Sequence, residues 1–287
     1  MTVTTTTYQN AETKRVDVHG TSFAYRELGP EGGTPVVLLN HLAAVLDNWD
    51  PRVVDGIATK HRVITFDNRG VGASGGKTPA SVEAMATDAI AFIKALGYDQ
   101  VDLLGFSMGG FVAQVIAQRE PQLVRKLVLT GTGPAGGVGI DRVTALTFLD
   151  ILRSALTFRN AKYYLFFTGT ANGRSEARKF LGRLKERTED RDTAISPASF
   201  RAHLKAISAW ADQEPSDLSV IEHPTFVANG DHDRMVPTSN SRDLAKRLPN
   251  ARLTIYPDAG HGGIFQHHNA FVAEALTFLE SASGSRR

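Results

Sequence analysis

The stretch VDLLGFSMGGFVAQVIAQ, residues 101–118, places Ser107 between Gly105 and Gly109 where two differently patterned segments meet. The apolar run before the serine is typical of a strand buried on both faces. The segment after it repeats apolar residues at helical spacing. The pattern predicts a strand, a sharp turn at Ser107 and a helix, an arrangement that holds a serine hydroxyl clear of the surface.

Strand and helix patterns alternate on both sides of this stretch. A hairpin is predicted near the start, and five further runs are interpreted as strands: residues 34–40, 61–70, 124–132, 223–231 and 251–260. Residues 81–97 show helical spacing, and Gly97 stands where a helix usually ends. Strand alternating with helix predicts right-handed crossovers and a mostly parallel sheet, so the fold class is α/β.

The alternation stops after Gly131. From about Ile140 to Asp217 the sequence is mainly helical, basic and rich in aromatic residues. We predict a core of residues 1–133 and 220–287 with a helical lid, residues 134–219, inserted in it. The lysines and arginines of the lid are interpreted as a solvated face. Its aromatic residues Phe148 and Trp210 are expected to contact substrate.

Composition limits the classes of function. The 287 residues carry a net charge of +2, with 42% hydrophobic and 22% charged residues, so neither nucleic acid nor an anionic membrane is an expected partner. No cysteine is present, which excludes disulfides, thiolate metal sites and cysteine nucleophiles. The N-terminus lacks the apolar core of a signal peptide, and we expect a cytoplasmic protein. Oligomeric state is left open, with a homo-oligomer among the options.

The G-x-S-x-G pattern occurs twice, around Ser107 and around Ser74. Ser74 lies in a glycine-rich loop with no helix directly behind it, so it is interpreted as a turn serine bonded to backbone. A third glycine motif, Gly131 to Gly136, matches G-x-G-x-x-G but lies late in the sheet. Dinucleotide binding requires that motif at the first strand-to-helix turn, so no cofactor is predicted.

A nucleophilic serine needs a base and an orienting carboxylate. Among nine histidines, His261 stands just past a predicted strand in a glycine-flanked loop. Asp231 and Asp233 both follow another predicted strand, and on their chemistry alone either one fits the role of the acid. Metal binding by Asp231, His232 and Asp233 is the rival interpretation, which we disfavour because no further ligands occur nearby at recognisable spacing.

With these residues in place, the sequence resembles the α/β-hydrolase fold family from about Asp17 to Leu279. The family order of nucleophile, acid and histidine is matched by Ser107, Asp233 and His261. Its acid loop, Gly-x-x-Asp-x-x-x-Pro, matches residues 230–237 with Asp233 as the acid, and DNRGVGAS matches its Asp-x-Arg-Gly-x-Gly-x-Ser loop. The resemblance implies an eight-stranded, mostly parallel sheet flanked by helices.

The resemblance also implies an oxyanion hole. The backbone N–H groups of Leu42 and Met108 are its expected donors. Relatives commonly have His-Gly after the strand that ends near Leu39, whereas this chain has Asn40-His41. His41 is therefore expected beside the hole, either as a substrate-binding group or as a turn histidine bonded to backbone.

The function implied is a cofactor-free serine hydrolase acting on an ester, lactone or related acyl bond of a small molecule. No metal is expected. Perhydrolase-like haloperoxidases and carbon–carbon bond hydrolases use the same triad and remain alternatives. From another class, a ligand-binding protein without turnover is also open. Enzymes with an aspartate nucleophile are excluded, because serine occupies the elbow.

Overall fold

The sheet has eight strands in the computed structural model, which describes residues 6–282. Their spatial order is β1-β2-β4-β3-β5-β6-β7-β8. Strand β2 pairs antiparallel with β1 and β4, and all other neighbours pair in parallel, as predicted. The strands are β1 (Lys14–Val18), β2 (Thr21–Leu28), β3 (Val36–Leu39), β4 (Val63–Phe66), β5 (Val101–Phe106), β6 (Val124–Thr130), β7 (Thr225–Gly230) and β8 (Ala251–Tyr256).

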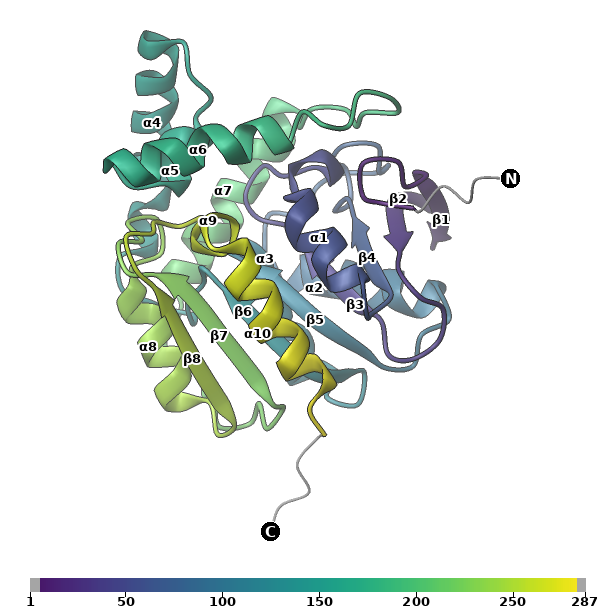
Figure 1. Cartoon of the computed structure of the whole chain (residues 1–287). Coiled ribbons are helices and arrows are strands. Elements are labelled where there is room, and N and C mark those ends of the chain that lie inside the picture. The colour runs from purple at the N-terminus through teal and green to yellow at the C-terminus, as the bar shows by residue number, and fades with distance from the viewer. Residues whose placement is uncertain (1–5, 283–287) are drawn as a thin grey trace.

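Helices cover both faces of the sheet (Figure 1). On one face lie α2 (Val82–Ala95), α3 (Met108–Arg119) and α8 (Thr238–Arg247). On the other face lie α1 (Pro51–Ala58), α9 (Gly263–Gln266) and α10 (His268–Glu280). The short 3₁₀ turn η1 (Leu46–Asn48) precedes α1. Each face thus has its own hydrophobic core, with the sheet between them.

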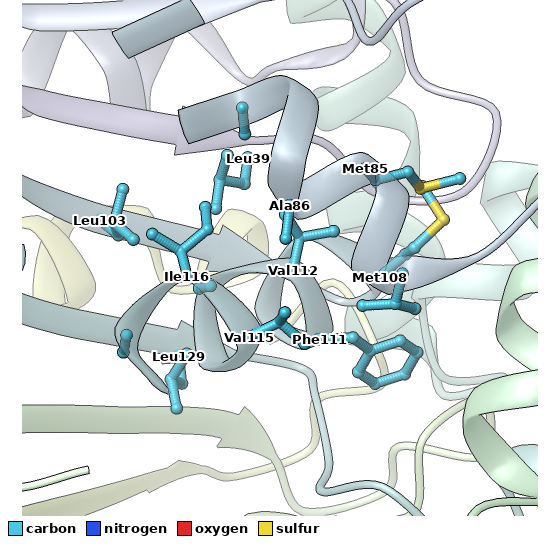
Figure 2. Packing of buried hydrophobic residues seen from close by; sticks show 14 of the residues in the cluster. Leu39, Met85, Ala86, Leu103, Met108, Phe111, Val112, Val115, Ile116 and Leu129 are labelled. Atoms are coloured by element: carbon cyan, nitrogen blue, oxygen red, sulfur yellow. The ribbon is translucent and has the colours of Figure 1, made fainter. Parts of the chain in front are cut away.

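Strand β3 shows why these runs are continuously apolar. Val37 and Leu39 belong to the core beneath α2 and α3, whereas Val36 and Leu38 belong to the core beneath α1 and α10. Successive strand residues point to opposite faces, so a strand covered on both sides needs an apolar residue at every position. Figure 2 shows the first core, where side chains of β3, β5 and β6 pack against α3: Leu39, Leu103, Leu129, Val112 and Ile116.

The chain between β6 and β7 is helical. It contains the 3₁₀ turn η2 (Ile140–Arg142) and four helices, α4 (Val143–Thr157), α5 (Lys162–Phe166), α6 (Ala171–Arg183) and α7 (Pro197–Ala211). We call residues 140–211 the helical insertion. In Figure 1, α4, α5 and α6 lie beyond one end of the sheet and α4 projects from the body. The lid boundaries at residues 134 and 219 stay a prediction.

Local sequence signals explain where the helices begin and end. The Ser81 hydroxyl accepts a hydrogen bond from the Ala84 N–H at 3.2 Å and so caps the start of α2. Gly97, just past the end of α2, has a φ of +83°, as expected for a residue that stops a helix. Within residues 6–282, none of the helices combines the length and apolarity needed to cross a bilayer.

Candidate active site

Ser107 stands at the junction of β5 and α3 with φ of 56° and ψ of −120°. A positive φ is uncommon for a residue with a side chain and stores strain that the surroundings must hold. Three hydrogen bonds do so. The Ser107 N–H donates to the Thr130 carbonyl at 2.9 Å, and the Ser107 carbonyl accepts from the Gly110 N–H and the Thr132 hydroxyl, both at 2.8 Å. The predicted strand, turn and helix are confirmed.

The glycines on either side of Ser107 are required by close backbone approach. A Cβ on Gly109 would overlap the carbonyl oxygen of Leu39, at the end of the neighbouring strand β3. A Cβ on Gly105 would overlap the carbonyl oxygen of Gly109. Only glycine lets α3 begin this close to the strands, which is how the turn stays tight.

His261 and Asp233 are hydrogen-bonded to each other. His261 lies in the loop after β8 and Asp233 in the loop after β7, and the distance from His261 Nδ1 to Asp233 Oδ2 is 2.8 Å. Because a carboxylate only accepts, Nδ1 carries the proton and Nε2 of neutral His261 is left as a proton acceptor. The other carboxylate oxygen accepts from the N–H groups of Met235 and Val236 at 2.8 and 3.0 Å. Both side chains are buried.

Ser107 and His261 line one cavity of about 140 Å³. It lies between the ends of the core strands and the helical insertion. The other lining residues are His41, Leu42, Ala43, Val143, Thr147, Ile151, Asn160, Ala161, Lys162, Leu165, Phe166, Phe200, Met235 and Val236. The structure therefore brings the predicted serine, histidine, His41 and Leu42 together, with Asp233 behind the histidine.

The two lid aromatics expected to contact substrate lie elsewhere. Trp210 is buried and stacks on Phe111 of α3 with ring centroids 5.2 Å apart, so it belongs to the core beneath α2 and α3. Phe148 is 53% exposed, and its ring meets Phe200 edge-on at 6.2 Å. Neither residue lines the cavity that contains Ser107, because one points into the core and the other toward solvent.

The turn after β3 lies next to the start of α3, because β3 and β5 are neighbours in the sheet. Within residues 6–282, the N–H groups of Leu42 and Met108 have no hydrogen-bond acceptor. Two imidazoles shape this turn. His41 Nδ1 donates to the Leu42 carbonyl at 2.8 Å, and the Ala43 N–H donates to Nδ1 of His203, from α7, at 3.2 Å. Both predicted oxyanion donors are thus unpaired.

His41 is neutral at pH 7. Burial, together with the nearby Lys162 ammonium, lowers the pKa of His41 well below its ordinary value. Since Nδ1 carries the proton that goes to the Leu42 carbonyl, Nε2 is a lone pair, and no described residue donates to it. His41 is therefore bonded to backbone, as one of the two expectations has it, and it also lines the cavity, whereas its role as a substrate-binding group stays a prediction.

The alternative candidates for the nucleophile and the acid, Ser74 and Asp231, make hydrogen bonds to backbone groups of nearby loops and strands. The Ser74 hydroxyl donates to the Asp67 carbonyl and accepts from the Ala24 N–H, both at 2.9 Å, which agrees with a turn serine. Asp231 accepts from the N–H groups of Asp258 and Ala259, so it braces the loop that carries His261 instead of contacting the imidazole. Beyond Ser107, His261, His41 and Leu42, the residues that line the cavity are not among the predicted site residues.

Lys162 and Thr147 were missed by sequence reasoning. Both belong to the helical insertion, and both line the cavity beside Ser107. The basic side chains of this segment were interpreted as a solvated face, and Lys162 is an exception to that interpretation. No sequence signal separates it from the neighbouring cations, because only the path of the chain turns α5 toward the core.

Comparisons with known proteins identify the family to which the fold belongs. The family model described as alpha/beta hydrolase fold matches residues 34–268. A non-heme haloperoxidase from Rhodococcus erythropolis is 30% identical over 276 residues, covering 91% of this chain and 97% of that protein.

Solved structures show the same fold. An alpha/beta hydrolase fold protein from Chitinophaga pinensis has a TM-score of 0.91 and 39% identity, covering 96% of this chain and 100% of that one. The enol-lactonase from Burkholderia xenovorans LB400 has a TM-score of 0.72 at 22% identity, covering 93% and 100%. The chain therefore belongs to the α/β-hydrolase fold family.

Proposed function

We propose that the protein is a serine hydrolase that cleaves a carboxylic ester, a lactone or a related acyl bond without a cofactor. The observation that carries this proposal is the 2.8 Å hydrogen bond between His261 and Asp233 at the cavity that Ser107 also lines. This bond holds the imidazole in the tautomer whose free nitrogen can accept a proton. A base in that state, near a serine on a strained turn, supports nucleophilic catalysis.

In the proposed reaction, His261 Nε2 takes the hydroxyl proton as Ser107 Oγ attacks the substrate carbonyl. The negative charge that develops on the carbonyl oxygen is bound by the N–H groups of Leu42 and Met108, which are free to donate. The tetrahedral intermediate collapses to an acyl-enzyme, and His261 returns the proton to the departing alkoxide. Water then attacks the acyl-enzyme by the same route. Asp233 stabilises the imidazolium during both halves.

Perhydrolysis is a second candidate, favoured by the haloperoxidase named among the relatives. In that reaction hydrogen peroxide replaces water as the attacking group, so the acyl-enzyme releases a peracid and the free serine. Supplying acetate, hydrogen peroxide and bromide to the wild-type protein and measuring bromination distinguishes the two. Bromination by the wild-type protein that disappears in Ser107→Ala supports a peracid formed at this site. If the wild-type protein cleaves esters rapidly but does not brominate, hydrolysis alone is supported.

The hydrolase proposal is tested with a fluorophosphonate probe and p-nitrophenyl acetate. We expect the probe to label Ser107, and Ser107→Ala to lower turnover by about 10⁴-fold or more. The matched control is Ser74→Ala, the serine of the other G-x-S-x-G sequence, which should still be labelled. Failure to label folded wild-type protein would overturn the proposal and favour a ligand-binding protein without turnover.

A further inference from the structure

Lys162 is the first residue of α5, and it forms part of the wall of two cavities. The inner one is the 140 Å³ cavity that contains Ser107 and His261. The second, which we call the outer cavity, has a volume of about 460 Å³ and shares Lys162 and Asn160 with the inner one. Lys162 therefore belongs to the walls of both the candidate site and a larger opening.

The Lys162 ammonium has no anionic partner. Across residues 6–282, no carboxylate forms an ion pair with Nζ and no acceptor forms a hydrogen bond with it. The acidic groups nearby are already engaged: Asp233 holds His261, and Asp47 pairs with Arg26 and Arg191. Burial lowers the pKa of Lys162 to about 8, so the ammonium is still the main form at pH 7. Lys162 is half-buried, and an ammonium partly withdrawn from water without a partner is suited to bind an anion that a ligand supplies.

Thr147 provides a second unpaired group in the inner cavity. Its side chain is 2% exposed, and its hydroxyl has no partner among the described residues. A hydroxyl can donate to a carboxylate oxygen. Nε2 of His41, also unpaired, is a lone pair and cannot bind an anion. Lys162 and Thr147 are therefore the two side chains suited to an anionic group of the substrate.

The outer cavity has the charge that would attract such a substrate. Besides Lys162 it is lined by four further cations, Arg159, Arg178, Lys185 and Arg191, and by one carboxylate, Asp47. An opening with an excess of one sign of charge raises the local concentration of ligands of the opposite sign. These basic residues line the same cavity as Lys162, which also lines the inner cavity.

We propose that Lys162 determines substrate specificity by binding a carboxylate of the substrate. The preferred substrates would be small esters or lactones in which a free carboxylate lies a few carbons from the scissile carbonyl. The size follows from the inner cavity, whose 140 Å³ equals about five water molecules at roughly 30 Å³ each. This inference rests on the proposed hydrolase function for the scissile bond, but the binding of the carboxylate can be measured without turnover.

The first test is calorimetric binding to the Ser107→Ala protein, which holds substrate without cleaving it. Monomethyl glutarate and methyl valerate have the same chain length, and only the first carries a carboxylate. We expect monomethyl glutarate to bind more tightly, and Lys162→Met to weaken its binding by about 10- to 100-fold, because a charge-assisted hydrogen bond is lost. Methyl valerate is the reference ligand, and the readout is the ratio of the two affinities, which should fall by the same factor in Lys162→Met.

Two variants complete the test. Lys162→Arg keeps the positive charge and should retain most of the preference for monomethyl glutarate. Lys205→Met removes an exposed lysine of α7, elsewhere in the helical insertion, and should leave both affinities unchanged. Equal affinity of monomethyl glutarate for the parent protein and for Lys162→Met would overturn the proposal.

Turnover separates this inference from the proposed function. With Ser107 present, Lys162→Met should lower the ratio of kcat/KM for monomethyl glutarate to kcat/KM for methyl valerate by a similar factor, and cleavage of methyl valerate by the variant shows that it is folded. If both esters are cleaved with no effect of Lys162→Met, the carboxylate site is wrong and the hydrolase stands. If binding depends on Lys162 but neither ester is cleaved, the hydrolase proposal fails and the anion site stands.

Discussion

The backbone conformation around Ser107 depends on the absence of a Cβ atom at its flanking glycines. The serine has a positive φ, and the first turn of α3 approaches β3 so closely that a Cβ on Gly109 would overlap the Leu39 carbonyl. Met108 is the first residue of α3, so its N–H has no intrahelical acceptor. A strained backbone and an unpaired N–H donor therefore lie at two adjacent residues, Ser107 and Met108. Such strain is often found next to a catalytic nucleophile.

Gly109→Ala tests this packing. The added methyl group should force α3 away from β3, lowering the free energy of unfolding by about 1–3 kcal/mol. Because the elbow moves, we also expect kcat to fall by about 100-fold. Urea unfolding and ester hydrolysis measure the two effects. Gly182→Ala in α6, where a Cβ has open space, is the control and should be neutral or stabilising by up to about 1 kcal/mol. A fully active Gly109→Ala protein would contradict the argument.

Helices α6 and α1 are joined by a buried ion pair. Arg183, at the end of α6, contacts both carboxylate oxygens of Asp50 at 2.6–3.0 Å and also donates to the Phe265 carbonyl in α9. Asp50 in turn caps the start of α1 by accepting from the Arg52 N–H at 3.0 Å. This ion pair therefore connects the helical insertion with two helices of the core, with α1 through the Asp50 carboxylate and with α9 through the Arg183 guanidinium.

Removing the arginine should be costly. Arg183→Met leaves the Asp50 carboxylate buried with its main partner gone, and we expect the free energy of unfolding to fall by about 3–5 kcal/mol. Lys179→Met is the control on the same helix, because the Lys179–Glu176 pair is exposed and should contribute less than about 1 kcal/mol. Urea unfolding measures both effects. If the two variants lower the free energy of unfolding equally, the buried ion pair does not stabilise the contact between α6 and α1.

Two carboxylates meet where the insertion contacts the core. Asp67 follows β4 and Asp192 lies between α6 and α7, and both accept a hydrogen bond from the Leu46 N–H, at 3.0 and 3.1 Å. Burial, together with the neighbouring Asp192 carboxylate, raises the pKa of Asp67 well above its ordinary value. The folded protein therefore holds a proton at Asp67 that the unfolded chain releases near pH 4.

The sign of the pH dependence follows from this raised pKa. The contribution of Asp67 to stability is complete below about pH 4 and is lost as the pH rises through the higher pKa of the folded state. Asp67→Asn replaces the carboxyl O–H donor toward Asp192 with an amide N–H donor and cannot ionise. We expect its stability relative to wild type to increase between pH 5 and pH 8, by at most about 1.4 kcal/mol per pH unit. Urea unfolding across this range measures it, and a constant difference would contradict the assignment.

Local pattern was sufficient for much of the fold and for two site residues. The run before Ser107, its flanking glycines and the helical spacing after it are short-range properties, and the structure has the predicted strand, turn and helix there. His261 could be selected because it follows a strand in a glycine-flanked loop. Asp231 and Asp233 could not be separated on chemistry alone, since both follow β7, and only the path of the loop directs Asp233 at the imidazole.

The positions of the insertion's side chains depended on contacts far apart in the sequence. Helical spacing shows that Trp210 and Phe148 are on a helix but not what each meets; one stacks on Phe111 and the other faces solvent. In the sequence, Lys162 looks like the other basic residues of the helical insertion, yet its side chain lines the cavity. Strands, helices and the elbow arise from hydrogen bonding and burial within a few residues, so the amino-acid order specifies them. Which lysine reaches the site depends on how α5 packs across the ends of the strands, and that is established only when the whole chain has folded.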